Sequence, residues 1–211
     1  MLILLILPAT NAIGSLIKEE ENNTITLDYI IFEEDGKQIN EQITVNQNDI
    51  TLFNEIIQEI FKTATSTNVI NITDIIKNLQ EKFGQNSILS LILKIIGLRP
   101  IQKRTLILSN GYGPKLDLRL KRDISFNKIF SLWYYVGMTS ITINSKTLII
   151  DPIPDTQLQF YRLIEGQQLG IMTKFKGFYM RIPSNFMEQK QSHTFFFGYT
   201  AKLWAFDLPD I

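Results

Sequence analysis

The first regular pattern of apolar and polar positions in this chain lies in two runs that are rich in β-forming residues. The runs extend from Ile25 to Phe32 and from Gln38 to Val45, and the dipeptide Asp35-Gly36 stands between them. Asp-Gly tolerates the positive φ angles of a tight turn. This order of residues therefore predicts a β-hairpin.

Helical spacing of apolar residues follows the hairpin. From Thr51 to Ala64 apolar residues recur every three or four positions, and Asp49 is placed as an N-cap. A second amphipathic helix is predicted between Ile75 and Phe83, with Gly84 placed to end it. The segment from Ser87 to Ile96 is nearly all apolar. We expect it to be a helix buried beneath its own domain or against a partner.

From Arg104 onward the pattern changes to short strands. These are predicted at Thr105–Leu108, Leu116–Leu120, Ile129–Val136, Ser140–Ile143 and Thr147–Ile150. Asn110-Gly111 and Gly113-Pro114 are typical of turns. Gln157–Ile164 is the best helix candidate in this half, and extended runs follow at Ile171–Ile182 and Thr194–Leu208. The expected class is α+β, with antiparallel sheets and few packed helices after an N-terminal extension of hairpin and helices.

Charge divides the chain although the net charge is zero. Residues 1–98 hold 6 Lys and Arg against 13 Asp and Glu, whereas residues 99–211 hold 15 against 8. This division predicts an acidic N-terminal domain that docks on proteins and a basic, β-rich C-terminal part. Because Lys and Arg release the counterions of each phosphate that they neutralise, we expect the basic half to meet a polyanion. The alternative is an ordinary solvated surface.

Composition excludes several kinds of chemistry. Cysteine is absent, which removes disulfides, thiolate nucleophiles and cysteine-based metal sites, and His193 is the single histidine. The apolar stretch Leu2–Leu7 resembles part of a secretory signal but lacks a basic n-region, and it is too short to span a bilayer. With the sequons at Asn22 and Asn71 it keeps secretion open as an alternative.

The candidate catalytic groups are better explained as residues of turns, helix caps and loops. No repeated spacing of Asp and Glu brings two carboxylates together, and Asp151 and Asp155 are typical of turns and caps. Gly111 to Lys115 has two glycines but lacks the full phosphate-binding loop pattern, which favours a turn. His193 is expected to be an exposed imidazole in a polar loop. We therefore expect no enzymatic activity, no cofactor and no metal.

Aromatic residues crowd the last part of the chain. The cluster consists of Phe175, Phe178, Tyr179, Phe195, Phe196, Phe197, Tyr199, Trp204 and Phe206, and Lys174, Lys176, Arg181 and Lys202 are interleaved with it. On an exposed sheet such rings could stack single-stranded bases. Core packing is the favoured interpretation, because strand residues alternate between faces. The expected result is a sheet with an aromatic interior and a basic rim that holds phosphates.

A family resemblance is carried by Phe175 to Arg181, Phe196 to Thr200 and Asp207 to Pro209. These segments resemble large-subunit ribosomal protein six, whose second domain contains Leu-x-Gly-x-Gly-Tyr-Arg and then Leu-Gly-Tyr-Ser-His-Pro. Gly177 matches the first glycine, Arg181 the arginine, and Gly198-Tyr199-Thr200 the Gly-Tyr-Ser core. Leu106–Leu120 and Ile141–Ile150 are similar to the first domain, so that the resemblance covers about residues 104–211.

The chain also departs from the family pattern. Tyr179 stands in place of the second glycine, and Ala201-Lys202 replaces His-Pro. The sequence ends at Ile211, before the basic Tyr-Lys-Gly-Lys-Gly segment with which the family touches ribosomal RNA. The expectation is either that a second polypeptide completes the C-terminal domain or that this domain is shortened.

The resemblance and the charge division together predict a structural constituent of a mitochondrial large ribosomal subunit. The expected partners are ribosomal RNA and, through residues 1–98, neighbouring ribosomal proteins. The predicted RNA-binding residues are Lys103, Arg104, Lys115, Arg119, Lys121, Arg122, Lys174, Lys176, Arg181 and Lys202. The alternatives are a secreted or lumenal β-rich binding protein and an accessory subunit of an organellar membrane complex.

Overall fold

The structure of the chain is a computed structural model, and it confirms the predicted α+β class with antiparallel sheets. It describes residues 24–33, 35–66, 77, 80–81, 84, 86–96, 104–111, 124–126, 130–135, 145–152, 159–183 and 192–208. All strand pairs among these residues are antiparallel.

Two sheets and two well-described helices make up most of the described fold. The large sheet contains, in spatial order, β2 (Gln38–Asn46), β1 (Thr24–Phe32), β9 (Lys176–Ile182), β10 (His193–Thr200), β3 (Thr105–Gly111), β6 (Lys146–Pro152) and β7 (Gln159–Glu165). The small sheet contains β11 (Lys202–Asp207), β8 (Gln168–Thr173), β5 (Phe130–Tyr135) and β4 (Ile124–Phe126). The helices are α1 (Gln47–Ser66) and α3 (Ser87–Ile96).

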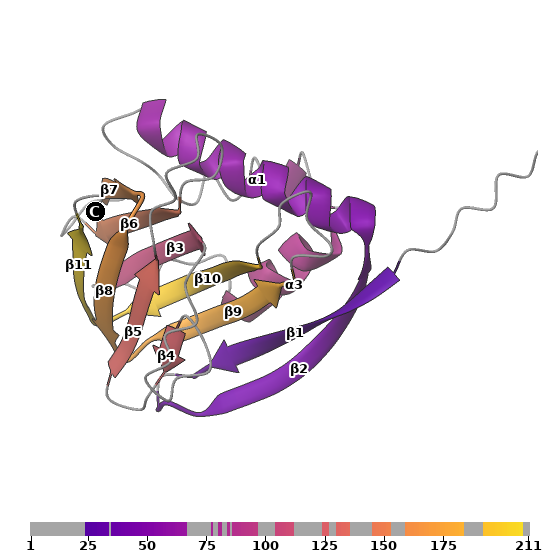
Figure 1. The fold of residues 1–211 in the computed structure, drawn as a ribbon, viewed down its shortest axis with the longest axis horizontal. Helices are drawn as coiled ribbons and strands as arrows, with labels where there is room; N and C mark the ends of the chain where they lie inside the picture. Colours follow the sequence, from indigo (N-terminus) through magenta and orange to yellow (C-terminus); the bar gives the residue numbers. More distant parts are fainter. Residues whose placement is uncertain are drawn as a thin grey trace, which may run out of the picture.

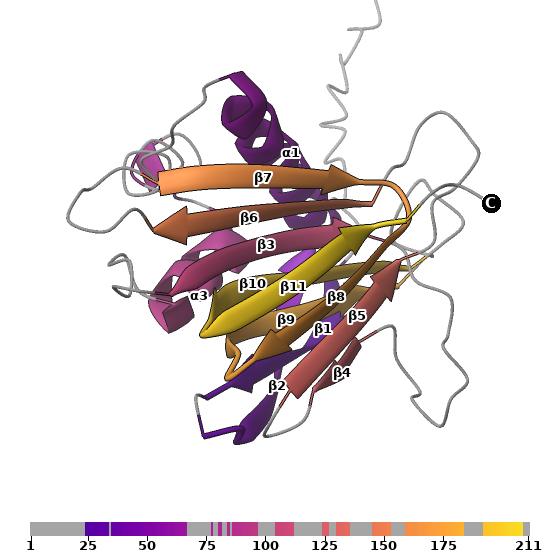
Figure 2. The same cartoon turned by 90° about the vertical axis from the view of Figure 1, so that its left-hand side faces the viewer.

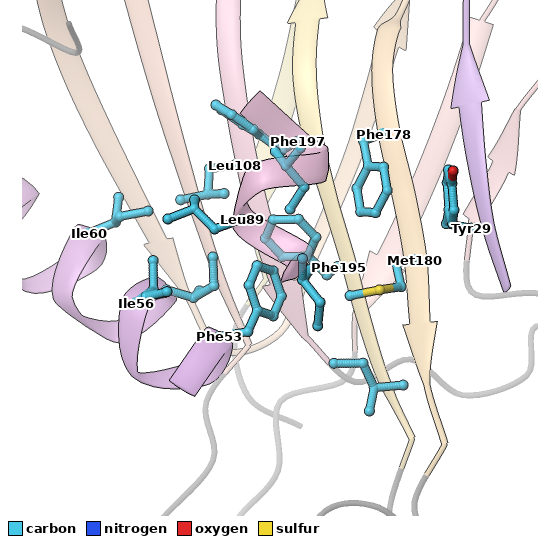
Figure 3. Close-up of a cluster of buried hydrophobic side chains, with 14 of the residues drawn as sticks. Tyr29, Phe53, Ile56, Ile60, Leu89, Leu108, Phe178, Met180, Phe195 and Phe197 are labelled. Carbon is cyan, nitrogen blue, oxygen red and sulfur yellow. The ribbon is translucent and has the colours of Figure 1, made fainter. Parts of the chain in front are cut away.

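These elements form three layers. Both helices lie against one face of the large sheet, and the small sheet lies against the other (Figures 1 and 2). Apolar side chains of α1 and α3 pack onto the large sheet, with Phe53 edge-on to Phe195 at 4.9 Å between ring centroids (Figure 3). A second cluster, which includes Trp133 and Phe196, fills the space between the sheets. The large sheet is therefore covered on both faces.

Coverage on both faces explains the burial of β10. Each of its residues is buried, with Phe195 and Phe197 in the cluster under the helices and Phe196 in the cluster between the sheets. A strand covered on both faces needs apolar side chains in consecutive positions. The run of three phenylalanines supplies them.

Several sequence predictions are confirmed. The hairpin forms as β1 and β2, and Gly36 at the turn has a φ of 82°. The helix predicted at Thr51–Ala64 is α1, but its N-terminus is capped by Asn46, whose Oδ1 accepts a hydrogen bond from the Asp49 backbone N–H at 2.7 Å. Asp49 therefore lies in the first turn and is not the N-cap.

The apolar segment at Ser87–Ile96 is the helix α3, and it packs within its own fold. Ile88, Leu89 and Ile92 are buried in the cluster beneath the helices, whereas Ser90 and Lys94 are exposed. The expectation of burial is confirmed for one side of this helix. Packing within the chain accounts for its apolar character.

Other predictions are wrong. The sequence predicts a helix at Gln157–Ile164, but residues 159–165 form the strand β7, which pairs with β6. Asn110 and Gly111 lie within β3, opposite Phe195 and Thr194, so they form no turn. Asp151 lies in β6. The extended run predicted at Ile171–Ile182 is confirmed, and it consists of two strands separated at Lys174 and Phe175.

Some predictions lie outside the described residues. They are the strands at Leu116–Leu120 and Ser140–Ile143, the turn at Gly113-Pro114, and most of the helix predicted between Ile75 and Phe83. Of that helix, Lys77, Gln80 and Glu81 are described and helical.

The boundary predicted before Arg99 does not separate two cores. Strand β1, from the acidic half, pairs with β9 from the basic half, with Tyr29 opposite Met180 and Phe32 opposite Gly177. The cluster beneath the helices also draws residues from both halves. Among the described residues, the acidic and basic halves therefore share one sheet and one core.

Candidate nucleic-acid interface

Strand register brings part of the predicted RNA-binding set to one end of the sheets. Lys176 lies opposite Tyr199, Lys202 lies opposite Thr173, and Arg104 directly precedes Thr105, which lies opposite Thr200. We call this group the basic end; its members are Arg104, Lys174, Lys176 and Lys202. Residues from three separate parts of the sequence meet there because their strands are neighbours.

Hydrogen bonds hold the corner that carries these cations. The backbone N–H of Ala201 donates to the carbonyl oxygen of Thr173 at 3.0 Å. The Thr200 hydroxyl lies 2.7 Å from that same oxygen and 3.0 Å from the carbonyl oxygen of Lys202. Lys174 occupies the adjoining turn with a φ of 50°, in the left-handed region. The turn from β8 to β9 and the corner from β10 to β11 are thus joined.

The cations of the basic end point in two directions. Lys176 has the same strand parity as Phe178 and Met180, which face the helices, and Arg104 has the same parity as Leu106, which also faces them. Lys202 instead belongs to the small sheet. Lys174, Lys176 and Lys202 are exposed, and Arg104 is half-buried.

A carboxylate lies near the basic end. Asp151 is exposed, and its Oδ1 accepts a hydrogen bond from the Thr105 hydroxyl at 2.5 Å. This hydroxyl donor satisfies one carboxylate oxygen without neutralising its charge. The positive members of the basic end still outnumber it.

Arg181 does not join the basic end. It lies near the opposite end of β9, in a pocket lined also by Asp28, Glu41 and Tyr29. The Tyr29 hydroxyl donates a hydrogen bond to Glu41, and burial together with this bond raises the pKa of Tyr29 to about 12. Two carboxylates in one pocket disfavour a phosphate. Arg181 is therefore a poor candidate for the predicted RNA contact.

The other predicted RNA-binding residues are not described by the structure. They are Lys103, Lys115, Arg119, Lys121 and Arg122.

The aromatic cluster divides between interior and surface. Phe175, Phe178, Tyr179, Phe195, Phe196, Phe197 and Tyr199 are buried, as core packing predicts. Trp204 and Phe206 are different, since 48% and 50% of their surfaces are exposed. For these two residues the prediction of a core position is wrong.

Strand alternation explains the exposure of Trp204 and Phe206. Leu203 and Ala205 of β11 pack against the cluster between the sheets, so the alternate residues Lys202, Trp204 and Phe206 point away from it. We call this side of the small sheet the outer face; it is turned toward the viewer in Figure 2. The alternation of residues along β11 predicts that Leu203 and Ala205 share one side and Lys202, Trp204 and Phe206 the other, but it does not predict which side faces inward.

Neighbouring strands extend the outer face. Trp204 lies opposite Ile171 of β8, which lies opposite Leu132 of β5. Phe206 likewise lies opposite Leu169, which lies opposite Tyr134. The Tyr134 hydroxyl accepts a hydrogen bond from Gln167 Nε2 at 2.8 Å. The outer face is thus apolar and aromatic, with Lys202 near one end.

His193 also departs from its predicted position. It is buried at the beginning of β10, opposite Ile182, and burial lowers its pKa to about 4. The imidazole is therefore neutral at physiological pH and is not the exposed group that the sequence suggested. Among the described residues, no group of three or more His, Asp or Glu is placed to hold a metal ion.

Comparison of the chain with protein-family models, curated proteins and solved structures finds no match. Within the part of the chain that the structure describes, none of the helices has the length and apolar character needed to cross a membrane. The candidate site is therefore interpreted from its own residues.

Proposed function

We propose that this protein is a non-enzymatic structural constituent of the mitochondrial large ribosomal subunit, and that its basic end holds the backbone of ribosomal RNA. The observation that carries this proposal is the convergence of Arg104, Lys174, Lys176 and Lys202 through strand register. Exposed ammonium groups at the end of a rigid sheet are suited to phosphate oxygens, which are repeated along every nucleic acid.

The strand pair β9 and β10 adds support to the proposal. Gly177 and Gly198, which match glycines of the ribosomal family in sequence, lie directly opposite each other in this pair. Phe175 packs beside both glycines. The two glycines that belong to the resemblance thus share one structural role.

The proposed binding mode depends on charge and shape. Lysines at the basic end would contact phosphates and give little discrimination between sequences. Neighbouring proteins would meet the acidic half, where β2 forms an edge of the large sheet and presents the polar residues Asn40, Gln42 and Thr44 to solvent. A polar edge strand offers backbone hydrogen-bonding groups to a partner.

Co-sedimentation of the full-length protein with mitochondrial large-subunit RNA at increasing salt tests this function. Lys174→Ala and Lys202→Ala should each weaken binding, and each should reduce the slope of log affinity against log salt by about one unit. Lys62→Ala, at an exposed position of α1 outside the basic end, is the matched control and should leave the slope unchanged.

Two results would contradict the proposal. One is a native protein that never sediments with large-subunit RNA at any salt concentration. The other is equal binding by the Lys174→Ala, Lys202→Ala and Lys62→Ala proteins, since the basic end would then make no phosphate contact.

A further inference from the structure

The outer face of the small sheet is an exposed surface that phosphate binding at the basic end does not explain. Trp204 and Phe206 leave about half of their surfaces in solvent, although the other side of β11 is turned toward the cluster between the sheets. That buried side instead holds Leu203 and the small residue Ala205. Large aromatic rings kept on the solvent side of a strand are typical of a binding surface.

The spacing of positions 204 and 206 along β11 suits a planar partner. Residues two apart on an antiparallel strand are separated by about 6.8 Å, because each residue advances the chain by about 3.4 Å. Stacked bases in a nucleic acid strand are separated by about 3.4 Å. A base inserted between the rings of Trp204 and Phe206 could therefore contact both.

Charge on the outer face favours a nucleic acid. Lys202 lies two residues before Trp204 on the same side of β11, and Lys174 follows Thr173, the cross-strand neighbour of Lys202. The described outward positions of β5, β8 and β11 hold no carboxylate; Asp207 of β11 lies on the same side of the strand as the inward-facing Leu203 and Ala205. A cation beside exposed rings, with no carboxylate among them, matches a phosphate followed by its base.

We propose that the outer face binds unpaired nucleotides of RNA, whose bases stack on Trp204 and Phe206 while Lys202 holds an adjoining phosphate. This proposal rests on the proposed function, and it adds a second mode of contact. The basic end holds phosphates of any RNA, whereas the outer face requires bases that are free to leave a helix. Tyr134 and Ile171 extend the surface across β5 and β8.

Intrinsic fluorescence offers a direct test, because the chain has 2 tryptophans in different surroundings. Trp133 is fully buried and Trp204 is half-exposed. Titration of the full-length protein with an eight-nucleotide oligoadenylate should quench the Trp204 emission. An abasic ribose-phosphate oligomer of the same length should not quench it. A Trp204→Phe protein should still bind oligoadenylate, but without quenching.

Affinity measurements separate the two modes of contact. Trp204→Ala and Phe206→Ala should each weaken oligoadenylate binding by about tenfold or more. Their affinity for an RNA duplex should stay within about twofold of the unmodified protein, because paired bases cannot stack on the rings. Lys174→Ala should weaken binding of both RNAs.

Several results would overturn the stacking proposal. One is oligoadenylate binding without quenching, and another is unchanged oligoadenylate affinity in the Trp204→Ala protein. In either case the proposed function still stands, provided that duplex binding depends on Lys174. Self-association that is lost in Trp204→Ala would show instead that a second copy covers the outer face. Failure of both RNAs to bind would contradict the proposed function as well.

Discussion

Gly177 and Gly198 lie directly opposite each other in the strand pair β9 and β10, and neither position has room for a side chain. A Cβ atom at Gly177 would lie 2.3 Å from the carbonyl oxygen of Phe197, and one at Gly198 would lie 2.3 Å from that of Lys176. The ring of Phe175 is also close to both positions. The close approach involves backbone atoms, which cannot move as a side chain can.

Substitution of either glycine should therefore destabilise the protein. We expect Gly177→Ala and Gly198→Ala each to lower the free energy of unfolding by about 3 kcal/mol or more, at the upper end of the cost of overpacking. Urea denaturation followed by circular dichroism measures this change. Thr26→Ala, at an exposed position of β1, is the control and should cost less than about 1 kcal/mol. Equal stability of Gly177→Ala and Thr26→Ala would contradict the packing described.

Gly170 makes room for the indole of Trp133 in the small sheet. The two residues lie opposite each other, and a Cβ at Gly170 would be 1.8 Å from the Trp133 ring. Gly170→Ala should destabilise the protein by about 3 kcal/mol, because the buried indole would have to move. The same substitution should cost less in a Trp133→Phe background, where the ring is smaller. A double-mutant cycle of unfolding free energies measures this coupling, and additive effects would refute the proposed steric conflict.

Local sequence patterns predicted elements whose neighbours lie close in the chain. Asp35-Gly36 identified the β1–β2 hairpin, and apolar spacing identified α1. The prediction of a helix was wrong at β7, because the Gln, Leu, Arg and Glu residues of this segment favour a helix locally. Pairing of β7 with β6, through Ile150 opposite Tyr161, stabilises the strand instead. Such pairing is a tertiary contact that local propensity does not contain.

The candidate site could be predicted only in part for the same reason. Lys174 and Lys176 are close in sequence, but Arg104 joins them through the pairing of β10 with β3 and β9. The exposure of Trp204 depends on which side of β11 meets the large sheet. Both sides of β11 carry apolar residues, so alternation alone leaves that choice open.

Asn86 links the beginnings of the two helices and should be important for stability. Its Oδ1 accepts a hydrogen bond from the Leu89 backbone N–H at 2.9 Å and so caps α3, while its Nδ2 donates to the Asp49 carbonyl oxygen at 2.8 Å. Asn86→Ala removes both bonds at a fully buried position and should cost about 2 kcal/mol. Asn86→Ser keeps a capping oxygen and should recover part of this loss, as measured by thermal unfolding. No difference between the two variants would argue against the cap.

His193 should make stability depend on pH below neutrality. Burial lowers its pKa from 6.5 to about 4, so the unfolded chain binds a proton between these values while the folded chain does not. Stability is therefore complete above pH 6.5 and falls as the pH decreases toward 4, by about 3 kcal/mol for this group. His193→Asn removes the titration and should show a correspondingly smaller loss over this range. Urea unfolding of both proteins from pH 7 to pH 4 isolates the difference, since the other titrating groups are shared. Parallel pH profiles would show that His193 is protonated in the folded protein as readily as in the unfolded chain.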